Sequence, residues 1–118
     1  YGREDLLFSM ALIQKGYQIK HLNNEIYHLG LDKNALFVSK TKKAMENLVF
    51  LAQHQLVDMK EMPLLDLVSM ISKFKMTRIV GKFHLFFEKL TINSSSVFFL
   101  NCTKISYVCY LKSKYEKK

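Results

Sequence analysis

Apolar residues recur at steps of three and four along most of the chain after Asp32, and this spacing restricts the fold more than any other feature. The pattern runs through residues 36–55, resumes over 64–74 directly after Pro63, and returns over 79–90. Steps of three and four place apolar side chains on one face of an α-helix. Proline is well tolerated in a first helical turn. The second half of the chain is therefore predicted to be helical.

The ends of these helices carry weaker signals. Asp32 or Asn34 is the expected cap of the first long helix, because short polar side chains accept backbone N–H bonds there. The run of polar residues 93–96 is expected to form a loop and a cap. Residues 97–111 are predicted as a final helix, although their richness in Val, Ile, Tyr, Phe and Thr also favours a strand.

The first thirty residues show a different pattern. A helix is expected from Glu4, ended by Gly16, since glycine readily takes the left-handed conformation that closes helices. Residues 17–22 and 26–28 are interpreted as two short strands around an Asn-Asn turn. Because two short strands alone make a marginal sheet, we expect them to join a sheet outside this chain. The expectation is an α+β fold, mostly helical, at the C-terminal end of a larger protein.

Charge divides the chain near its middle. Residues 1–59 carry seven Lys or Arg against six Asp or Glu, and residues 60–118 carry eleven against four. We therefore divide the chain at this point, into residues 1–59 and a basic helical extension over 60–118. No apolar run reaches the roughly 20 residues that span a bilayer. Cys102 and Cys109 are too far apart on a helix for a disulfide, so reduced thiols are expected.

Reactive side chains are concentrated near the start of the chain, where Glu4 and Asp5 precede an apolar run and His21 and His28 follow it. A carboxylate facing a cleft can act as a general base. The alternative is that the acidic pair only complements the positive end of the helix dipole. From the residues alone, the histidines are more readily explained as structural than as metal ligands.

The order of these segments resembles one enzyme family. Tyr1-Gly2-Arg3-Glu4-Asp5, an apolar helix, Lys15-Gly16-Tyr17, the run IKHLNNEIYHLGL and then NALFVSKTKKAMENL are similar to the C-terminal part of family-2 type, GT-A fold glycosyltransferases. The closest likeness is to those of Bacteroides-like bacteria that build surface polysaccharide. The likeness is good over residues 1 to about 55, and the remainder is similar only in general character. It implies that residues 1–59 are the C-terminal, acceptor-side part of a GT-A catalytic domain.

The resemblance implies a reaction and roles for three residues. Asp5 would be the general base that takes the acceptor hydroxyl proton, and Glu4 would bind or orient the acceptor. The sugar would pass from a nucleotide-sugar donor to a saccharide or lipid-linked acceptor with inversion. A divalent cation, Mg²⁺ or Mn²⁺, would assist the departing diphosphate. His28 matches a family position that can join that metal's ligands, whereas His21 does not.

The chain departs from the family pattern in three places. Ala11 stands where relatives often have Arg or Lys, and Glu25 follows Asn24 where they often have Pro. No Asp-x-Asp triplet, the family's donor-side metal motif, occurs in the sequence. We therefore expect most of the metal site and the donor-binding half to lie upstream, and this chain alone to be inactive.

The basic, aromatic residues 73–118 leave three interpretations open. They can pack on a catalytic domain with solvated lysines outside, or lie on an anionic membrane with their aromatic rings among the headgroups. Nucleic-acid binding is the weakest of the three, because charge and aromatic residues come without a recognised reader motif. The expected location is cytoplasmic, and peripheral to the inner membrane if the membrane interpretation holds. The rival to an enzyme is thus a non-enzymatic basic helical module that binds a membrane surface or nucleic acid.

Overall fold

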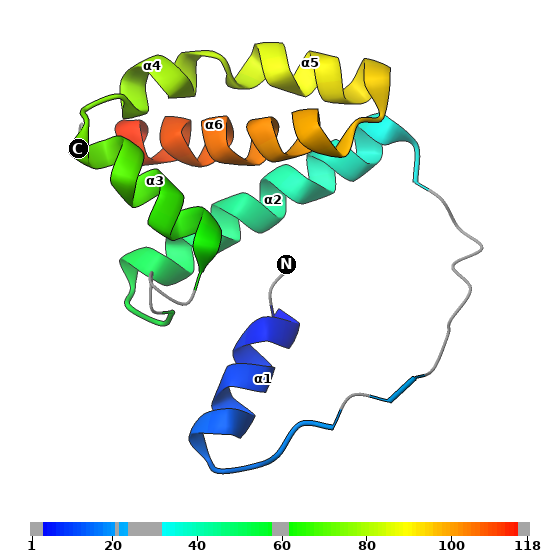
Figure 1. Cartoon of the computed structure of the whole chain (residues 1–118), viewed down its shortest axis with the longest axis vertical. Helices are drawn as coiled ribbons and strands as arrows, with labels where there is room; N and C mark the ends of the chain where they lie inside the picture. Colours follow the sequence, from blue (N-terminus) through cyan, green and yellow to red (C-terminus); the bar gives the residue numbers. More distant parts are fainter. Residues whose placement is uncertain (1–3, 21, 24–31, 58–61, 116–118) are drawn as a thin grey trace.

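The computed structural model describes residues 4–20, 22–23, 32–57 and 62–115, and its regular secondary structure within them is α-helical (Figure 1). The helices are α1 (Glu4–Gln14), α2 (Asn34–Gln53), α3 (Pro63–Lys73), α4 (Thr77–Lys82), α5 (His84–Ser94) and α6 (Val97–Tyr115). The described residues contain no strand. The expectation of an α+β, GT-A type fold is therefore wrong for this chain.

The expected hairpin, over residues 17–22 and 26–28, accounts for the difference between the expected and the observed fold class. Residues 17–20 and 22–23 follow α1 without regular secondary structure, and the predicted strand over 26–28 lies outside the described residues. A strand needs a neighbour to satisfy its backbone N–H and C=O groups. Nothing in the described part of the chain offers Tyr17–Lys20 such a neighbour, so their alternating side chains did not produce a strand.

Helix α1 ends as its sequence predicts. Gly16 has a φ of +79°, and the backbone N–H groups of Gly16 and Tyr17 donate to the carbonyls of Ile13 and Leu12 at 2.9 and 3.0 Å. This pair of bonds is the Schellman motif, which satisfies carbonyls left over at a helix C-terminus. Helices α2 and α3 end in the same way at Gln55 and Lys75, whose φ angles are also positive although neither is glycine.

The expected cap of α2 was assigned wrongly. Lys33 occupies the cap position and makes no side-chain cap bond. Asp32 instead pairs with Lys40, one of its oxygens lying 2.7 Å from Nζ. The Asn34 amide donates to the carbonyl of Ile92 and the hydroxyl of Ser95, at 3.0 and 2.7 Å. Both side chains therefore serve contacts other than the first turn of α2.

The predicted helix over 79–90 is present but divided. Helix α4 stops at Lys82 and α5 starts at His84, with Phe83 between them at φ −85° and ψ 1°. The N–H of Phe87 still donates to the carbonyl of Phe83 at 3.0 Å, so the two helices follow each other closely. They form one long arm along the edge of the molecule (Figure 1). The ambiguous segment after residue 96 is helical, as α6.

Helix α6 is the centre of the bundle. It runs between the α4–α5 arm on one side and α2 on the other, and α3 crosses near its C-terminal end (Figure 1). Four consecutive residues, Ser106, Tyr107, Val108 and Cys109, are all buried. Since successive residues are about 100° apart around a helix, four in a row cover most of its circumference. Neighbours therefore enclose α6 from several directions.

The main core draws on both of the ranges 1–59 and 60–118. Its best-buried apolar members are Met45, Leu48, Val68, Val108 and Cys109, each at most 2% exposed. Leu7 and Met10 of α1 pack against the same cluster. Cys102 and Cys109 are both free, which confirms the expectation that they form no disulfide. Complete burial raises the pKa of the Cys109 thiol to about 11.

Candidate functional site

The expected catalytic residues lie at the start of α1. Glu4 is the first residue of that helix, and its side chain lies outside what the structure describes. Asp5 follows in the first turn and is exposed to solvent. His28, the expected metal ligand, lies outside the described residues, as does His21. The structure therefore places Asp5 in the exposed first turn of α1, and the positions of the Glu4 and His28 side chains lie outside what it describes.

No group of three or more His, Cys, Asp or Glu side chains that could hold a metal ion occurs within the described ranges. The expectation of Mg²⁺ or Mn²⁺ with His28 as a ligand consequently stays a prediction.

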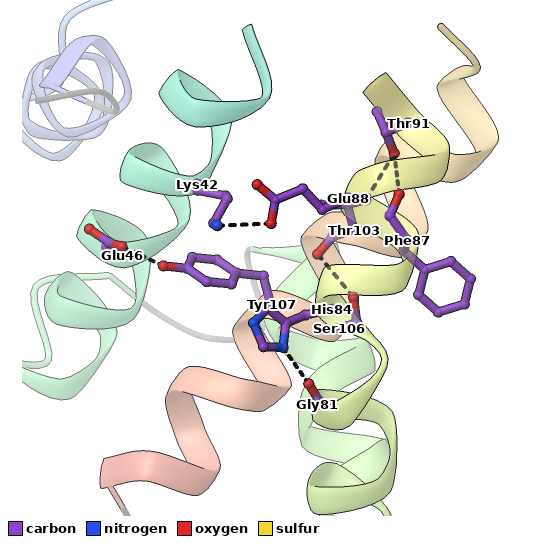
Figure 2. A network of polar contacts seen from close by, with 10 residues as sticks. All are labelled: Lys42, Glu46, Gly81, His84, Phe87, Glu88, Thr91, Thr103, Ser106 and Tyr107. Carbon is purple, nitrogen blue, oxygen red and sulfur yellow. Dashed lines mark hydrogen bonds and ion pairs between the residues drawn. The ribbon is translucent and has the colours of Figure 1, made fainter. Parts of the chain in front are cut away.

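A polar network joins α2, α5 and α6 (Figure 2). Lys42 of α2 lies 2.9 Å from a carboxylate oxygen of Glu88 on α5. The same ammonium lies 4.9 Å from the centre of the Tyr107 ring, close enough for a cation–π contact. The Tyr107 hydroxyl donates to the carboxylate of Glu46. These four side chains thus connect three helices at one point.

The chemistry of this network suits the packing of α2, α5 and α6 against one another. Burial and the hydrogen bond to Glu46 together raise the pKa of Tyr107 well above its ordinary value of 10.0. A tyrosine that holds its proton so firmly is a poor acid or nucleophile near neutral pH. Its hydroxyl is also already committed to Glu46. We therefore assign the network to packing rather than to catalysis.

A second polar contact, between two threonines, fastens α5 to α6. The hydroxyls of Thr91 and Thr103 lie 2.9 Å apart in the buried interface (Figure 2). Each also bonds to a backbone carbonyl four residues earlier, that of Phe87 and that of Phe99. Ser106, one turn further along α6, donates to the carbonyls of Cys102 and Thr103. Small hydroxyl-bearing residues let the helices approach closely while keeping their oxygens satisfied.

His84 occupies the junction of the α4–α5 arm with α6. Its Nδ1 lies 2.7 Å from the carbonyl oxygen of Gly81, to which it donates (Figure 2). Its ring stacks on Tyr110 with centroids 4.3 Å apart. The bond and the stacking fix the imidazole against α6, where it forms one wall of a surface cavity.

That cavity is cationic. It holds about 410 Å³ and lies between α4 and the C-terminal part of α6. Its lining consists of Arg78, Gly81, Lys82, His84, Tyr110, Ser113 and Lys114. Three of these side chains are positively charged and none is a carboxylate. The composition suits an anionic ligand such as a phosphate group.

Another cavity, of about 380 Å³, opens between α2, α3 and α6. Its walls are mostly aliphatic, from Val49, Leu65, Val68 and Val108, with Lys112 and Tyr115 also among the lining residues. The main core lies directly behind it. Apart from Lys112, Gln53 and Tyr115, it offers no polar group that could select a ligand.

Exposed apolar side chains line the outer side of the α4–α5 arm. Ile79, Phe83 and Phe86 are 57%, 52% and 58% exposed. None of the helices in the described ranges is long and apolar enough to pass through a bilayer.

Sequence reasoning found the basic residues of this region but not the cavity. The predicted helix of residues 79–90 contains Lys82 and His84, yet Lys114 is 30 or more residues away in the chain. Likewise, 46 residues separate Lys42 from Glu88. No local spacing could have paired them.

Comparison with models of known protein families yields no match, and neither the curated proteins nor the solved structures contain a chain that matches this one.

Proposed function

We propose that this chain supplies the acceptor-side part of an enzyme that transfers a sugar from a nucleotide-sugar donor to a saccharide or lipid-linked acceptor, with inversion, in surface polysaccharide synthesis. Asp5 carries the proposal, because it combines the aromatic-Gly-Arg-Glu-Asp sequence context with an exposed position in the first turn of α1. An exposed carboxylate at a helix start is free to meet a substrate hydroxyl. The expected location is the cytoplasmic face of the inner membrane.

In this proposal Asp5 accepts the proton of the acceptor hydroxyl. The acceptor oxygen then forms a bond to the anomeric carbon of the donor sugar. The bond between that carbon and the diphosphate oxygen breaks, and the nucleoside diphosphate leaves with the electron pair. Glu4 hydrogen-bonds the acceptor. The divalent cation would be held mainly by residues that this chain does not supply, with His28 as the expected ligand from this chain.

The test is Asp5→Asn in the protein that contains this chain. Asparagine keeps the size of the side chain but cannot take up the proton, and general-base catalysis contributes roughly 10²- to 10⁴-fold. Transfer should fall by about that factor while the dissociation constant of the donor stays unchanged. Asp32→Asn is the matched control, because Asp32 is an exposed carboxylate paired with Lys40 and outside the motif. Near-normal transfer by the Asp5→Asn protein would overturn the assignment.

The second candidate function is surface binding without catalysis. It is favoured by the cationic cavity of α4 and α6 and by the exposed apolar side chains on the α4–α5 arm. Sugar-nucleotide turnover by the complete protein separates the two candidates, because only the first predicts turnover that is lost in the Asp5→Asn protein.

A further inference from the structure

The outer side of the α4–α5 arm carries an apolar row, made of Ile79, Phe83 and Phe86. Their spacing of four and three residues places them on the same side of the nearly continuous helical arm. Each exposes more than half of its side chain to water. Single exposed apolar residues are ordinary on protein surfaces, but a row along two consecutive helices indicates a surface that another molecule covers.

A basic row, made of Arg78, Lys82 and Lys89, runs beside the apolar row. These residues are exposed and recur at steps of four and seven, again on one side of the arm. The ion pairs formed between described residues, Lys42–Glu88 and Lys40–Asp32, involve none of them. Their charge is therefore not neutralised by a carboxylate of the described part of the chain.

Two members of the basic row also line the cationic cavity. Arg78 and Lys82 approach it from α4, and Lys114 approaches from α6. The buried Gly81 and the stacked rings of His84 and Tyr110 complete the wall between them. The cavity thus offers three positive charges to one anion. The apolar row lies next to the cavity and can contact the apolar part of a ligand, such as an acyl chain.

An anionic bilayer is the partner that matches both rows. Interfacial helices lie in the membrane plane with an apolar side among the acyl chains and basic residues among the headgroups. A phosphodiester carries the single negative charge and the oxygen acceptors that arginine and lysine bind best. Nucleic acid shares the phosphate, but it would leave the aliphatic Ile79 and the neighbouring Leu85, which is 64% exposed, without an apolar partner.

We propose that the α4–α5 arm lies on an anionic phospholipid bilayer, with Ile79, Phe83 and Phe86 in the interface and a lipid phosphate held by Arg78, Lys82 and Lys114. The inference concerns attachment to the membrane. Membrane attachment does not depend on whether the chain takes part in sugar transfer. A negative result in the vesicle assay would therefore leave the proposed sugar transfer standing, and a negative Asp5→Asn result would leave the membrane proposal standing.

The experiment measures partition of the 118-residue chain onto vesicles of phosphatidylcholine, with and without phosphatidylglycerol, by co-sedimentation. Binding should require phosphatidylglycerol and weaken as salt is added, because exposed charges are screened. Each basic residue near an anionic surface contributes about fivefold to binding. Arg78→Gln/Lys82→Gln should therefore weaken binding roughly 25-fold. Lys33→Gln/Lys43→Gln removes the same charge at the start of α2 and within it, and should change binding far less.

A second variant pair tests the apolar row. Phe83→Ser should weaken vesicle binding about tenfold, since it removes an aromatic side chain that is partly buried in the interface. Phe50→Ser is the matched control, because Phe50 of α2 is 51% exposed against 52% for Phe83. Circular dichroism of each variant checks that the helices remain.

Lys114→Gln tests the cavity itself. It should reduce binding to phosphatidylglycerol vesicles at least as much as Arg78→Gln, while the single control Lys43→Gln should have little effect. Equal binding to vesicles with and without phosphatidylglycerol would overturn the proposal. So would saturable binding of inorganic phosphate without vesicle binding. Binding to duplex DNA that depends on Arg78 and Lys82, without binding to vesicles, would overturn it as well.

Discussion

Gly81 of α4 lies directly against the backbone of Tyr110 on α6. A Cβ atom placed on Gly81 would stand 2.9 Å from both the Cα and the N of Tyr110. Real Cβ atoms essentially never approach other atoms so closely, and the atoms involved here are backbone, which cannot rotate away. The hydrogen at this position is what allows the α4–α5 arm to pack onto the central helix.

We therefore expect Gly81→Ala to destabilise the chain. In an ordinary helix interior this substitution stabilises by about 0.5–1 kcal/mol, because glycine loses more conformational freedom on folding. Here overpacking should reverse the sign and cost about 1–3 kcal/mol. Urea unfolding followed by circular dichroism measures the difference. Asn101→Ala on the exposed side of α6 should change the free energy of unfolding by less than about 0.5 kcal/mol. A stabilised Gly81→Ala protein would contradict the close packing.

Tyr107→Phe should also lower the free energy of unfolding. The substitution keeps the ring under Lys42 but removes the hydroxyl that donates to the Glu46 carboxylate. A hydrogen bond to a charged group contributes about 1.5–3 kcal/mol. The control is Tyr110→Phe, three residues along the same helix. The free energy of unfolding is measured by urea unfolding. If it falls by a similar amount in both variants, the hydrogen bond to Glu46 contributes no more than the hydroxyl of Tyr110.

Stability should fall as the pH rises above 9, because of Cys109. Its pKa is raised from 9.0 to about 11 by burial in the folded chain. The unfolded thiol therefore ionises first. The stabilisation is complete below pH 9 and is lost as the pH approaches 11. One such group changes the free energy of unfolding by up to about 1.4 kcal/mol per pH unit.

Cys109→Ala should flatten this decline between pH 9 and pH 10, although it lowers stability at neutral pH by removing a buried side chain. Cys102→Ala is the matched control, since Cys102 is only partly buried. An unchanged pH slope in the Cys109→Ala protein would exclude the thiol as the cause. In native conditions a thiol reagent should also modify Cys102 before Cys109.

The amino-acid sequence by itself predicted most of the helical segments from residue 34 onward, although not the division between α4 and α5 at Phe83. Helical spacing of apolar residues, Pro63 in a first turn and Gly16 at a helix end all act through neighbours three to five residues away. Such contacts form within one segment and can be read from its sequence. What the sequence did not predict is the conformation at some helix ends. Lys33 stands at the N-cap of α2 without a side-chain cap bond, and Gln55 and Lys75 adopt positive φ angles that sequence alone would assign to glycine.

Only the tertiary structure decided the fold class and the sites. The alternating residues 17–22 predicted a strand, but a strand exists only with a partner, and the described chain provides none. The pairing of Lys42 with Glu88, the approach of Gly81 to Tyr110 and the convergence of Arg78, Lys82 and Lys114 all join segments about 30 or more residues apart. Packing around α6 fixes these distances, because the central helix is enclosed by neighbours that its own sequence does not specify.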